Sequence, residues 1–188
     1  MILHQQLRTQ QLFLSSLTAS HAGGPYLAWM NDPDVTRYTE SSGRRFDRAD
    51  LETFIVQCNE DPVVLLLGMF DLDDSRHVGN IKLGPLEMRH RRADVGLIVG
   101  DRSKWGRGFA KEAISAVTSY AFCELGIEKL TAGCYARNIG SARAFLGAGW
   151  HEEGCRYRHG VVDGRREDVI QIARFSDGSV PYETEHLL

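Results

Sequence analysis

A segment with two closely spaced glycines, Trp105-Gly-Arg-Gly-Phe-Ala110, leads directly into a helical pattern. Apolar residues then recur at spacings of three and four, which predicts an amphipathic helix over residues 108–125. The free N–H groups of a first helical turn and the helix dipole attract anions, and glycines let a phosphate approach the backbone. We therefore expect an anion site here, with positive charge added by Arg107 and Lys104. The alternative is a tight turn that only starts the helix.

Two familiar nucleotide motifs do not fit this segment. A P-loop requires G-x-x-x-x-G-K-[ST], which the sequence does not contain. A dinucleotide fingerprint requires a third glycine where this chain has Lys111, and it places the loop directly after a strand of a βαβ unit. Neither motif is therefore expected to explain the loop.

The sequence before the loop changes from a helical to an extended pattern. Residues 12–17 predict a strand and residues 21–30 a short helix, and residues 48–59 predict an amphipathic helix with Leu51, Phe54, Ile55 and Cys58 on one face. Three apolar segments of strand length follow, joined by short polar connections, at residues 63–70, 77–83 and 93–99. Their serial order favours an antiparallel meander.

The sequence after the loop returns to alternating strand and helix patterns. A strand is expected at residues 129–135, and a helix at residues 138–148 with Ala142, Phe145 and Leu146 turned inward. Residues 156–175 predict a β-hairpin around Asp163-Gly164, a pair that suits a tight turn. This order of elements indicates an α+β domain with a mixed sheet.

Length and composition limit the classes of function. The 188 residues fit one domain, residues 1–188, and the net charge of −3 gives no general reason to expect nucleic-acid binding. The four cysteines form no C-x-x-C pair and have no zinc-ligand spacing with histidine, so reduced thiols and no metal site are expected. No signal-peptide pattern opens the chain, and its longest apolar run is too short to span a bilayer. A cytoplasmic protein without a membrane partner is expected.

The order of strand, loop, long helix, strand and asparagine-bearing helix resembles that of the GNAT superfamily of N-acetyltransferases. The family's loop motif, R/Q-x-x-G-x-G/A, is matched by Trp105-x-x-Gly108-x-Ala110, with Trp105 in place of the usual first residue. Asn138-Ile-Gly-Ser141, followed by Phe145, Gly149 and Trp150, looks like the family's second cofactor helix and the strand after it. The resemblance implies a GNAT-like α+β fold. Its central sheet would be mixed and mostly antiparallel, flanked by helices, with a V-shaped splay between two central strands.

Further segments resemble a narrower subgroup of this family. They are Trp29-Met-Asn31-Asp32-Pro33, Val78-Gly79-Asn80-Ile81, Ala93-Asp94-Val-Gly96 and the tail with Asp163-Gly164 and Asp168. The subgroup includes ribosomal-protein alanine, spermidine and amino-sugar-nucleotide acetyltransferases. The resemblance covers nearly the whole chain, and the order and spacing of the motifs are more specific than any one of them.

The resemblance implies an acyl-CoA-dependent N-acetyltransferase that uses acetyl-CoA (CoA) and no metal. Backbone groups of Ile98, Val99 and Gly100 would pair with the pantetheine arm, and one backbone N–H would stabilise the oxyanion. Asn138 would bond the pantetheine, with Ser141 and Arg143 nearby. The pyrophosphate would lie against Trp105, Gly106, Arg107, Gly108, Phe109, Ala110 and Lys111.

The catalytic groups follow less directly from the resemblance. An attacking ammonium must lose a proton, and Asp94 is the first candidate base, with Glu87 second. Many family members carry a tyrosine acid where this chain has Phe145, which cannot donate a proton and is expected in the core. Ser141, Tyr135 or water would protonate the leaving thiolate instead. A covalent route through Cys134 is the minor alternative, because family members usually transfer the acyl group directly.

The acceptor is the open part of this interpretation. Asn31, Arg37 and Tyr38 lie in the family's variable, substrate-facing region, where they would line the acceptor pocket or only cap and turn the chain. The expected acceptor is a small-molecule primary amine such as an amino-sugar nucleotide, because residues 77–84 and 93–96 resemble segments of surface-polysaccharide enzymes. The basic run at residues 89–92 would attract an anionic substrate or form a solvated loop. The alternatives are a protein N-terminus, a polyamine and a CoA-binding sensor without catalysis. A deep basic pocket would favour the sugar nucleotide, an acidic groove a polyamine and an open groove a peptide. A homodimer through the C-terminal hairpin is possible.

Overall fold

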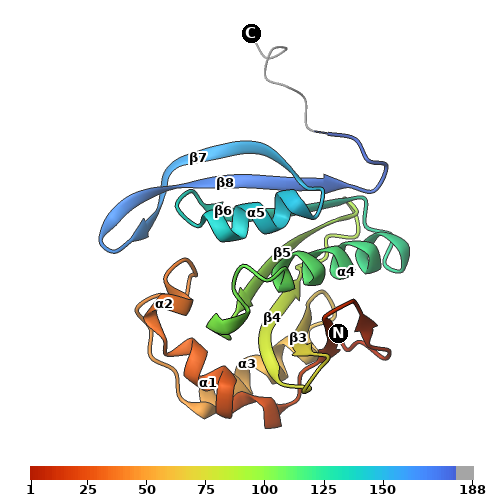
Figure 1. Ribbon diagram of the computed structural model, residues 1–188. Helices are drawn as coiled ribbons and strands as arrows, with labels where there is room; N and C mark the ends of the chain where they lie inside the picture. The colour runs from red at the N-terminus through yellow and green to blue at the C-terminus, as the bar shows by residue number, and fades with distance from the viewer. Residues whose placement is uncertain (181–188) are drawn as a thin grey trace.

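The segments with extended patterns form one eight-stranded sheet in a computed structural model that describes residues 1–180 (Figure 1). The strand order is β1-β2-β3-β4-β5-β6-β8-β7. All neighbouring strands are antiparallel except β5 and β6, which are parallel. The strands are β1 (Leu7–Arg8), β2 (Leu12–Ser16), β3 (Leu65–Asp71), β4 (His77–Leu83), β5 (Arg92–Val99), β6 (Lys129–Tyr135), β7 (His151–Val162) and β8 (Arg165–Phe175).

Helices cover both faces of the sheet. Apolar side chains of α4 and α5 pack on one face, and those of η1, α1, α2 and α3 pack on the other. The short 3₁₀ turn η2 joins β5 to α4. The helical elements are η1 (Ala19–Ala22), α1 (Gly24–Met30), α2 (Pro33–Thr36), α3 (Arg48–Glu60), η2 (Arg102–Lys104), α4 (Phe109–Cys123) and α5 (Ile139–Gly147).

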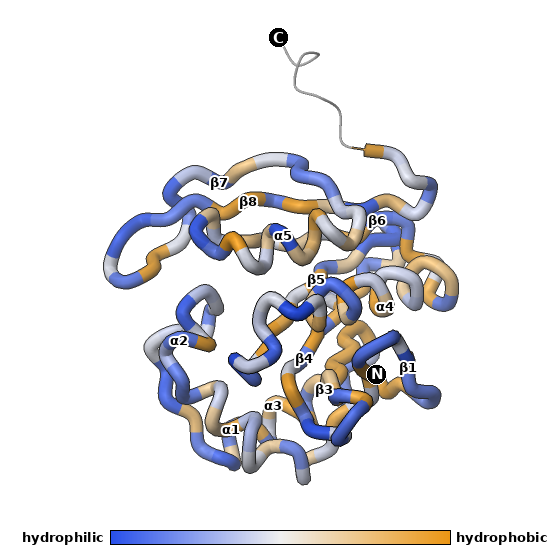
Figure 2. The backbone as a smooth tube through the Cα atoms, in the orientation of Figure 1, coloured by the Kyte–Doolittle hydropathy of each residue, from blue (hydrophilic) through white to orange (hydrophobic). Residues whose placement is uncertain are grey.

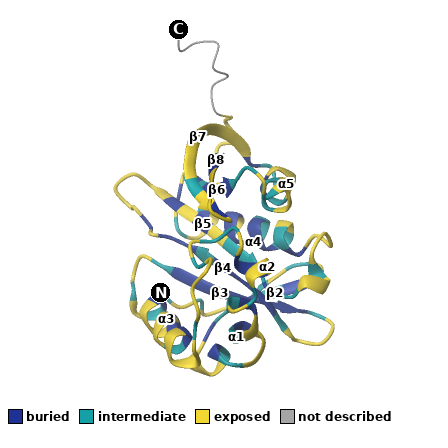
Figure 3. Cartoon of the chain, turned by 90° about the vertical axis from the view of Figure 1, so that its left-hand side faces the viewer, coloured by how far each residue is buried: buried dark blue, intermediate teal, exposed yellow. Residues whose placement is uncertain are grey.

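Strand β3 lies between these two layers, which explains its continuous apolar sequence. Leu65, Leu67 and Met69 pack in the core shared with α4, whereas Leu66 and Phe70 pack in the core shared with α1 and α3. A strand covered on both faces needs apolar residues at every position, not only at alternate ones. In Figures 2 and 3, β3 is accordingly apolar and buried, while the edge strand β7 is largely exposed.

The two parallel strands separate after a short paired stretch. Only Arg92, Ala93 and Asp94 of β5 pair with β6, although β5 continues for five more residues. The strands therefore enclose a V-shaped splay that opens toward their carboxyl ends, where α4 and α5 begin. The expected α+β fold, with a mixed, mostly antiparallel sheet and a splay, is confirmed.

Most expected elements form within a few residues of their expected bounds, and β4 and β6 match them fully. Two inward assignments were wrong: Phe54 is 37% exposed and Leu146 is 41% exposed. Each residue is one position from a better-buried neighbour, Ile55 or Phe145, and one residue rotates a side chain by about 100° around a helix. The apolar stripes are therefore narrower than the sequence pattern indicated.

Other expectations concern the chain as a whole. The four cysteines are free thiols, and two of them, Cys58 and Cys134, are buried. Within residues 1–180, no helix has both the length and the apolar character needed to cross a membrane. The single domain expected over residues 1–188 includes residues 181–188, which lie outside the described part of the chain.

A partly buried histidine, His77, lies at the start of β4 beneath α1. Its ring contacts those of Trp29 and Phe70, each with a centroid separation of 4.9 Å, and its Nε2 donates a hydrogen bond to Asn80 Oδ1 at 2.7 Å. Burial lowers the pKa of His77 to about 4, although the bond to Asn80 opposes this shift. The imidazole is therefore neutral in the folded chain at neutral pH.

This buried imidazole predicts a loss of stability in weak acid. Between pH 6.5, the ordinary pKa of histidine, and about 4, the unfolded chain binds a proton that the folded chain excludes. The free energy of unfolding should fall as the pH falls through this window. Urea titrations should show a smaller pH slope for His77→Phe than for the wild type, while the exposed His90→Phe control keeps the wild-type slope. Equal slopes for all three proteins would contradict this account.

Candidate cofactor and acceptor site

The glycine-containing loop leaves several backbone donors free at the start of α4. Gly106 and Gly108 have positive φ angles of 71° and 91°, which other residues adopt only with strain. Gly108 is the N-cap of α4 and has no side chain to cap the first turn. Among the described residues, no acceptor pairs with the N–H groups of Gly106, Gly108, Phe109, Ala110 or Lys111. The loop can therefore bind an anion through its backbone.

The two cations beside this loop have different roles. Arg107 is exposed and makes no ion pair within the described residues. Lys104 turns inward and forms a buried ion pair with Asp71, with 12% and 3% of the two side chains exposed. The hydrogen bond from Lys104 holds the pKa of Asp71 below its usual range. The expectation that Lys104 adds positive charge to the anion site was wrong. Its ammonium group pairs with Asp71 and so anchors η2 to the end of β3.

The register of β5 decides which of its backbone groups face the splay. The Gly84 N–H donates to the Asp94 carbonyl at 2.8 Å, and the Gly100 N–H donates to the Val78 carbonyl at 2.9 Å. Backbone groups alternate in direction along a strand, so Ile98, which lies an even number of residues from both Asp94 and Gly100, also faces β4. The backbone groups of Ile98 and Gly100, which were expected to pair with a pantetheine arm, are therefore directed toward β4 and away from the splay.

The alternate residues of β5 supply the unpaired backbone groups that face the splay. Leu97 and Val99 direct their backbone groups away from β4, beyond the part of β5 that pairs with β6. The Trp105 indole N–H donates to the Val99 carbonyl at 2.7 Å, which leaves the Val99 N–H available. Trp105 thus ties the anion loop to the end of β5.

Gly100 serves the packing behind the splay. A Cβ built at Gly100 would overlap the Trp29 indole, so only glycine allows the ring of α1 to lie against this backbone. The end of β5 is consequently fixed from α1 on one side and from Trp105 on the other.

On the other side of the splay, Asn138 caps α5. Its Oδ1 accepts a hydrogen bond from the Ser141 N–H at 3.3 Å, and its side-chain nitrogen has no partner within residues 1–180. The Ser141 hydroxyl lies 3.3 Å from the Cys134 sulfur, and Arg143 is exposed on α5. Burial raises the pKa of the Cys134 thiol, so little of the nucleophilic thiolate forms there.

Phe145 belongs to the core, as expected from the sequence. It is 2% exposed and packs edge-on against Trp150 with a centroid separation of 4.8 Å. It takes no part in the polar lining of the splay.

The two candidate bases occupy different positions. Asp94 lies at the closed end of the splay, exposed on the face that carries α1 to α3, and its carboxylate accepts a hydrogen bond from the Thr131 hydroxyl. Glu87 lies in the β4–β5 connection, before the paired stretch begins, and forms an ion pair with Arg92 at 2.8 Å. Asp94 is the stronger candidate base, because it lies beside the splay and forms no ion pair among the described residues, whereas Glu87 lies before the splay and pairs with Arg92.

Segments from opposite ends of the chain meet over the same face of the sheet. The Tyr135 hydroxyl of β6 donates to Glu40 at 3.1 Å, and its ring lies 6.1 Å from that of Tyr38. Burial and the Glu40 carboxylate raise the pKa of Tyr135. Arg37, beside α2, forms an ion pair with Asp163 in the β7–β8 turn, which approaches α2 in Figure 1. Tyr38 thus lies beside the end of β6, and Arg37 lies beside the β7–β8 turn.

The Asn31 side chain has a structural role, which the sequence left open as the alternative to lining the acceptor pocket. Its side-chain nitrogen donates to the carbonyls of Leu27 and Phe46 at 3.0 and 2.9 Å, and its oxygen accepts from the Phe46 N–H at 3.0 Å. With both donors and its acceptor engaged, the Asn31 amide holds the loop before α3 against the end of α1.

Two carboxylates on this face have no cationic partner. The carboxylates of Asp94 and Glu40 accept bonds from neutral hydroxyls and form no ion pair within the described residues. Two nearby cations are paired, Arg37 with Asp163 and Arg137 with Glu167, the latter at 2.6 Å, whereas Lys82 of β4 lies on the same face without an ion pair among the described residues. Sequence patterns did not reveal Glu40, because it lies in an irregular segment without a motif.

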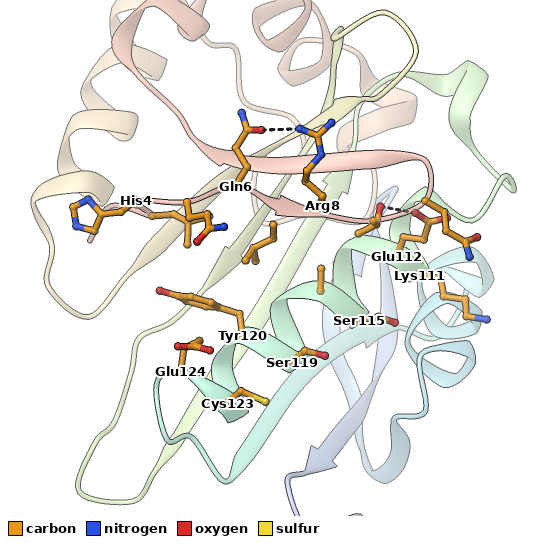
Figure 4. A pocket seen from close by; sticks show the side chains of 16 residues that line it. His4, Gln6, Arg8, Lys111, Glu112, Ser115, Ser119, Tyr120, Cys123 and Glu124 are labelled. Carbon is orange, nitrogen blue, oxygen red and sulfur yellow. Dashed lines mark hydrogen bonds between the residues drawn. The ribbon is translucent and has the colours of Figure 1, made fainter.

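Other features of the chain lie away from the splay. The basic run at residues 89–92 follows β4, where Arg91 pairs with Glu128 and Arg92 with Glu87. A groove of about 890 Å³ lies between the segment around β1 and the outer side of α4 (Figure 4). No group of three or more metal-ligating side chains occurs within residues 1–180.

Comparison with known proteins places the chain among acetyltransferases. A family model described as "Acetyltransferase (GNAT) domain" matches residues 11–151. The uncharacterized N-acetyltransferase YoaA of Bacillus subtilis (strain 168) is 31% identical over 168 residues, which cover 87% of this chain and 92% of YoaA.

Two solved structures share the fold at low sequence identity. Spermidine N-acetyltransferase from Vibrio cholerae, in complex with CoA and spermine, has a TM-score of 0.80 at 20% identity, covering 90% of this chain and 98% of that one. Ribosomal-protein-S5-alanine acetyltransferase from Vibrio fischeri has a TM-score of 0.80 at 16% identity, covering 92% and 97%.

The contrast between Lys104 and Arg107 gives a stability prediction. Lys104→Met should lower the free energy of unfolding by about 3 kcal/mol, because it leaves the Asp71 carboxylate buried without its partner. The double variant Lys104→Met/Asp71→Asn should recover much of this loss, since no buried charge remains. Arg107→Met, at an exposed position, should unfold at the wild-type urea concentration. Equal stability of Lys104→Met and Arg107→Met would show that the ion pair is not structural.

Proposed function

The chain belongs to the GNAT family of acetyltransferases, and from this premise we propose that it acetylates a cationic primary amine, either a small alkylamine or a peptide N-terminus. It is an acyl-CoA-dependent N-acetyltransferase with acetyl-CoA as acyl donor. We base this choice of acceptor on two carboxylates, Asp94 and Glu40. Both lie on the face of the sheet that carries α1 to α3, and neither has a cationic partner among the described residues.

The same face argues against the amino-sugar nucleotide expected from the sequence. A nucleotide diphosphate calls for cations, yet Arg37 and Arg137 are both paired with carboxylates. The groove beside α4 and a small hollow around Gly149 both lie away from the splay. A surface with two unpaired carboxylates favours an ammonium-bearing acceptor.

The donor side of the splay has the groups that acetyl-CoA requires. We assign the pyrophosphate to the free N–H groups of Gly106 and of residues 108–111, and to the side chain of Arg107. The pantetheine arm would pair with Leu97 and Val99 and with the side-chain nitrogen of Asn138. Acetyl-CoA supplies the activated thioester, and these residues would hold its carbonyl between β5 and β6.

Catalysis in this proposal proceeds by direct attack in a ternary complex. Asp94 accepts the ammonium proton, directly or through water, and the freed nitrogen lone pair attacks the thioester carbonyl. The Val99 N–H stabilises the oxygen as it gains negative charge. The carbon–sulfur bond then breaks, and the nitrogen releases its second proton to solvent as the amide forms. The departing thiolate takes a proton from the Ser141 hydroxyl, which takes one back from solvent.

Kinetic measurements can show whether Asp94 or Glu87 is the general base. Asp94→Asn should lower kcat about 100-fold, the usual scale for a lost general base, with little change in the KM for acetyl-CoA. Glu87→Gln should leave kcat close to the wild-type value, because its carboxylate lies before the splay and pairs with Arg92. Thiol release from acetyl-CoA measures both. A large loss with Glu87→Gln and none with Asp94→Asn would reverse the assignment.

Glu40 tests the nature of the acceptor. Glu40→Gln should raise the KM for a cationic amine several-fold without changing the KM for acetyl-CoA, since one carboxylate near the acceptor is lost. The control is Glu60→Gln, an exposed carboxylate at the end of α3. The assay screens polyamines, amino acids, N-terminal peptides and amino-sugar nucleotides with wild-type protein. Turnover restricted to the amino-sugar nucleotides would refute a cationic acceptor.

Several broader expectations from the sequence stay predictions. They are the single domain over residues 1–188, the possible homodimer, the cytoplasmic location and the lack of a nucleic-acid partner.

A further inference from the structure

Glu112 lies in the first turn of α4, beside the proposed pyrophosphate site. A carboxylate that faced the loop would repel a diphosphate and compete for the same N–H groups. Instead, Glu112 points toward the segment between β1 and β2, as Figure 4 shows. Its Oε2 accepts the Thr9 hydroxyl at 2.6 Å and the Gln11 N–H at 3.0 Å, and its Oε1 accepts the Gln11 side-chain nitrogen at 2.7 Å.

Gln11 also contacts the loop itself. Its side-chain nitrogen donates to the Arg107 carbonyl at 3.2 Å, in addition to its bond with Glu112. One amide group therefore bridges the residue before the N-cap and the first turn of α4. Gln11 is held in turn by the start of the β3–β4 turn, because its own carbonyl accepts the Leu72 N–H at 2.9 Å.

The bond to Arg107 fixes the direction of a backbone donor in the loop. The carbonyl of Arg107 and the N–H of Gly108 belong to the same planar trans peptide and point in opposite directions. Since Gln11 holds the carbonyl on the β2 side, the Gly108 N–H is directed to the opposite side, where it has no acceptor among the described residues. Gly108 has a φ of 91° and no side chain, so external support is needed to keep this peptide in one orientation.

We propose that Gln11 is a positioning residue for the acyl donor, which holds the Arg107–Gly108 peptide toward the pyrophosphate and turns the Glu112 charge away from it. The inference rests on the proposed function only in taking this loop as the pyrophosphate site. Gln11 itself does not touch the donor. Loss of the Gln11 side chain weakens the binding of acyl donors that carry a pyrophosphate. The binding of acyl donors without a pyrophosphate is unaffected.

The test compares Gln11→Met with Gln10→Met. The neighbouring Gln10 is exposed, and its side chain makes no hydrogen bond within residues 1–180, so it is a matched control. Each protein is assayed with acetyl-CoA and with S-acetylpantetheine, which lacks the pyrophosphate, and the binding of CoA and pantetheine is measured by calorimetry. Gln11→Met should raise the KM for acetyl-CoA and the Kd for CoA about tenfold, the effect of losing about 1.4 kcal/mol of hydrogen bonding.

Selectivity between the donors distinguishes positioning from general damage. For Gln11→Met, three values should stay within about twofold of the wild type: the KM for S-acetylpantetheine, the Kd for pantetheine and the kcat. Gln11→Asn, whose amide reaches one methylene less far, should show the same selective loss. Equal weakening of both donors, or unchanged binding of CoA, would overturn the proposal. If wild-type protein binds CoA but acetylates no amine, the proposed function fails, and the calorimetry still decides the role of Gln11.

Discussion

The rest of the structure depends on the short length over which β5 and β6 pair. Three residues of β5 hold the two halves of the sheet together, and the strands then part. On its other edge β5 stays bonded to β4 as far as Gly100, which keeps Leu97 and Val99 directed into the gap. Because α4 and α5 start where β5 and β6 end, two helix N-termini meet at the open end. A cofactor that is apolar at one end and anionic at the other fits this combination of bare strand edge and helix dipoles.

In the proposed function, charge separates the two substrates across the sheet. The loop before α4 presents backbone N–H groups and Arg107, while the face carrying α1 to α3 presents Asp94 and Glu40. The intervening charged groups are neutralised locally, Lys104 by Asp71 and Arg37 by Asp163. An anionic donor and a cationic acceptor can therefore approach one carbonyl from opposite faces without competing for the same residues.

Sequence patterns predicted the elements well and the partners of individual side chains poorly. Periodicity located β4, β6 and α4 because burial fixes which residues are apolar. It could not show that Lys104 turns inward, since that depends on Asp71, 33 residues away. The family resemblance assigned Ile98 instead of Leu97 to the splay, because the direction of a backbone group depends on strand register, which no local pattern contains. Gln11 lies 101 residues from Glu112, so only the fold brings them together.

The most direct test of the central claim is a crystal structure of the protein with CoA bound. It should show the pantetheine arm between β5 and β6, hydrogen-bonded to the Val99 N–H, and the pyrophosphate against the N–H groups of Gly106 and of residues 108–111. CoA in the groove between β1 and the outer side of α4, with the splay filled only by water, would contradict it.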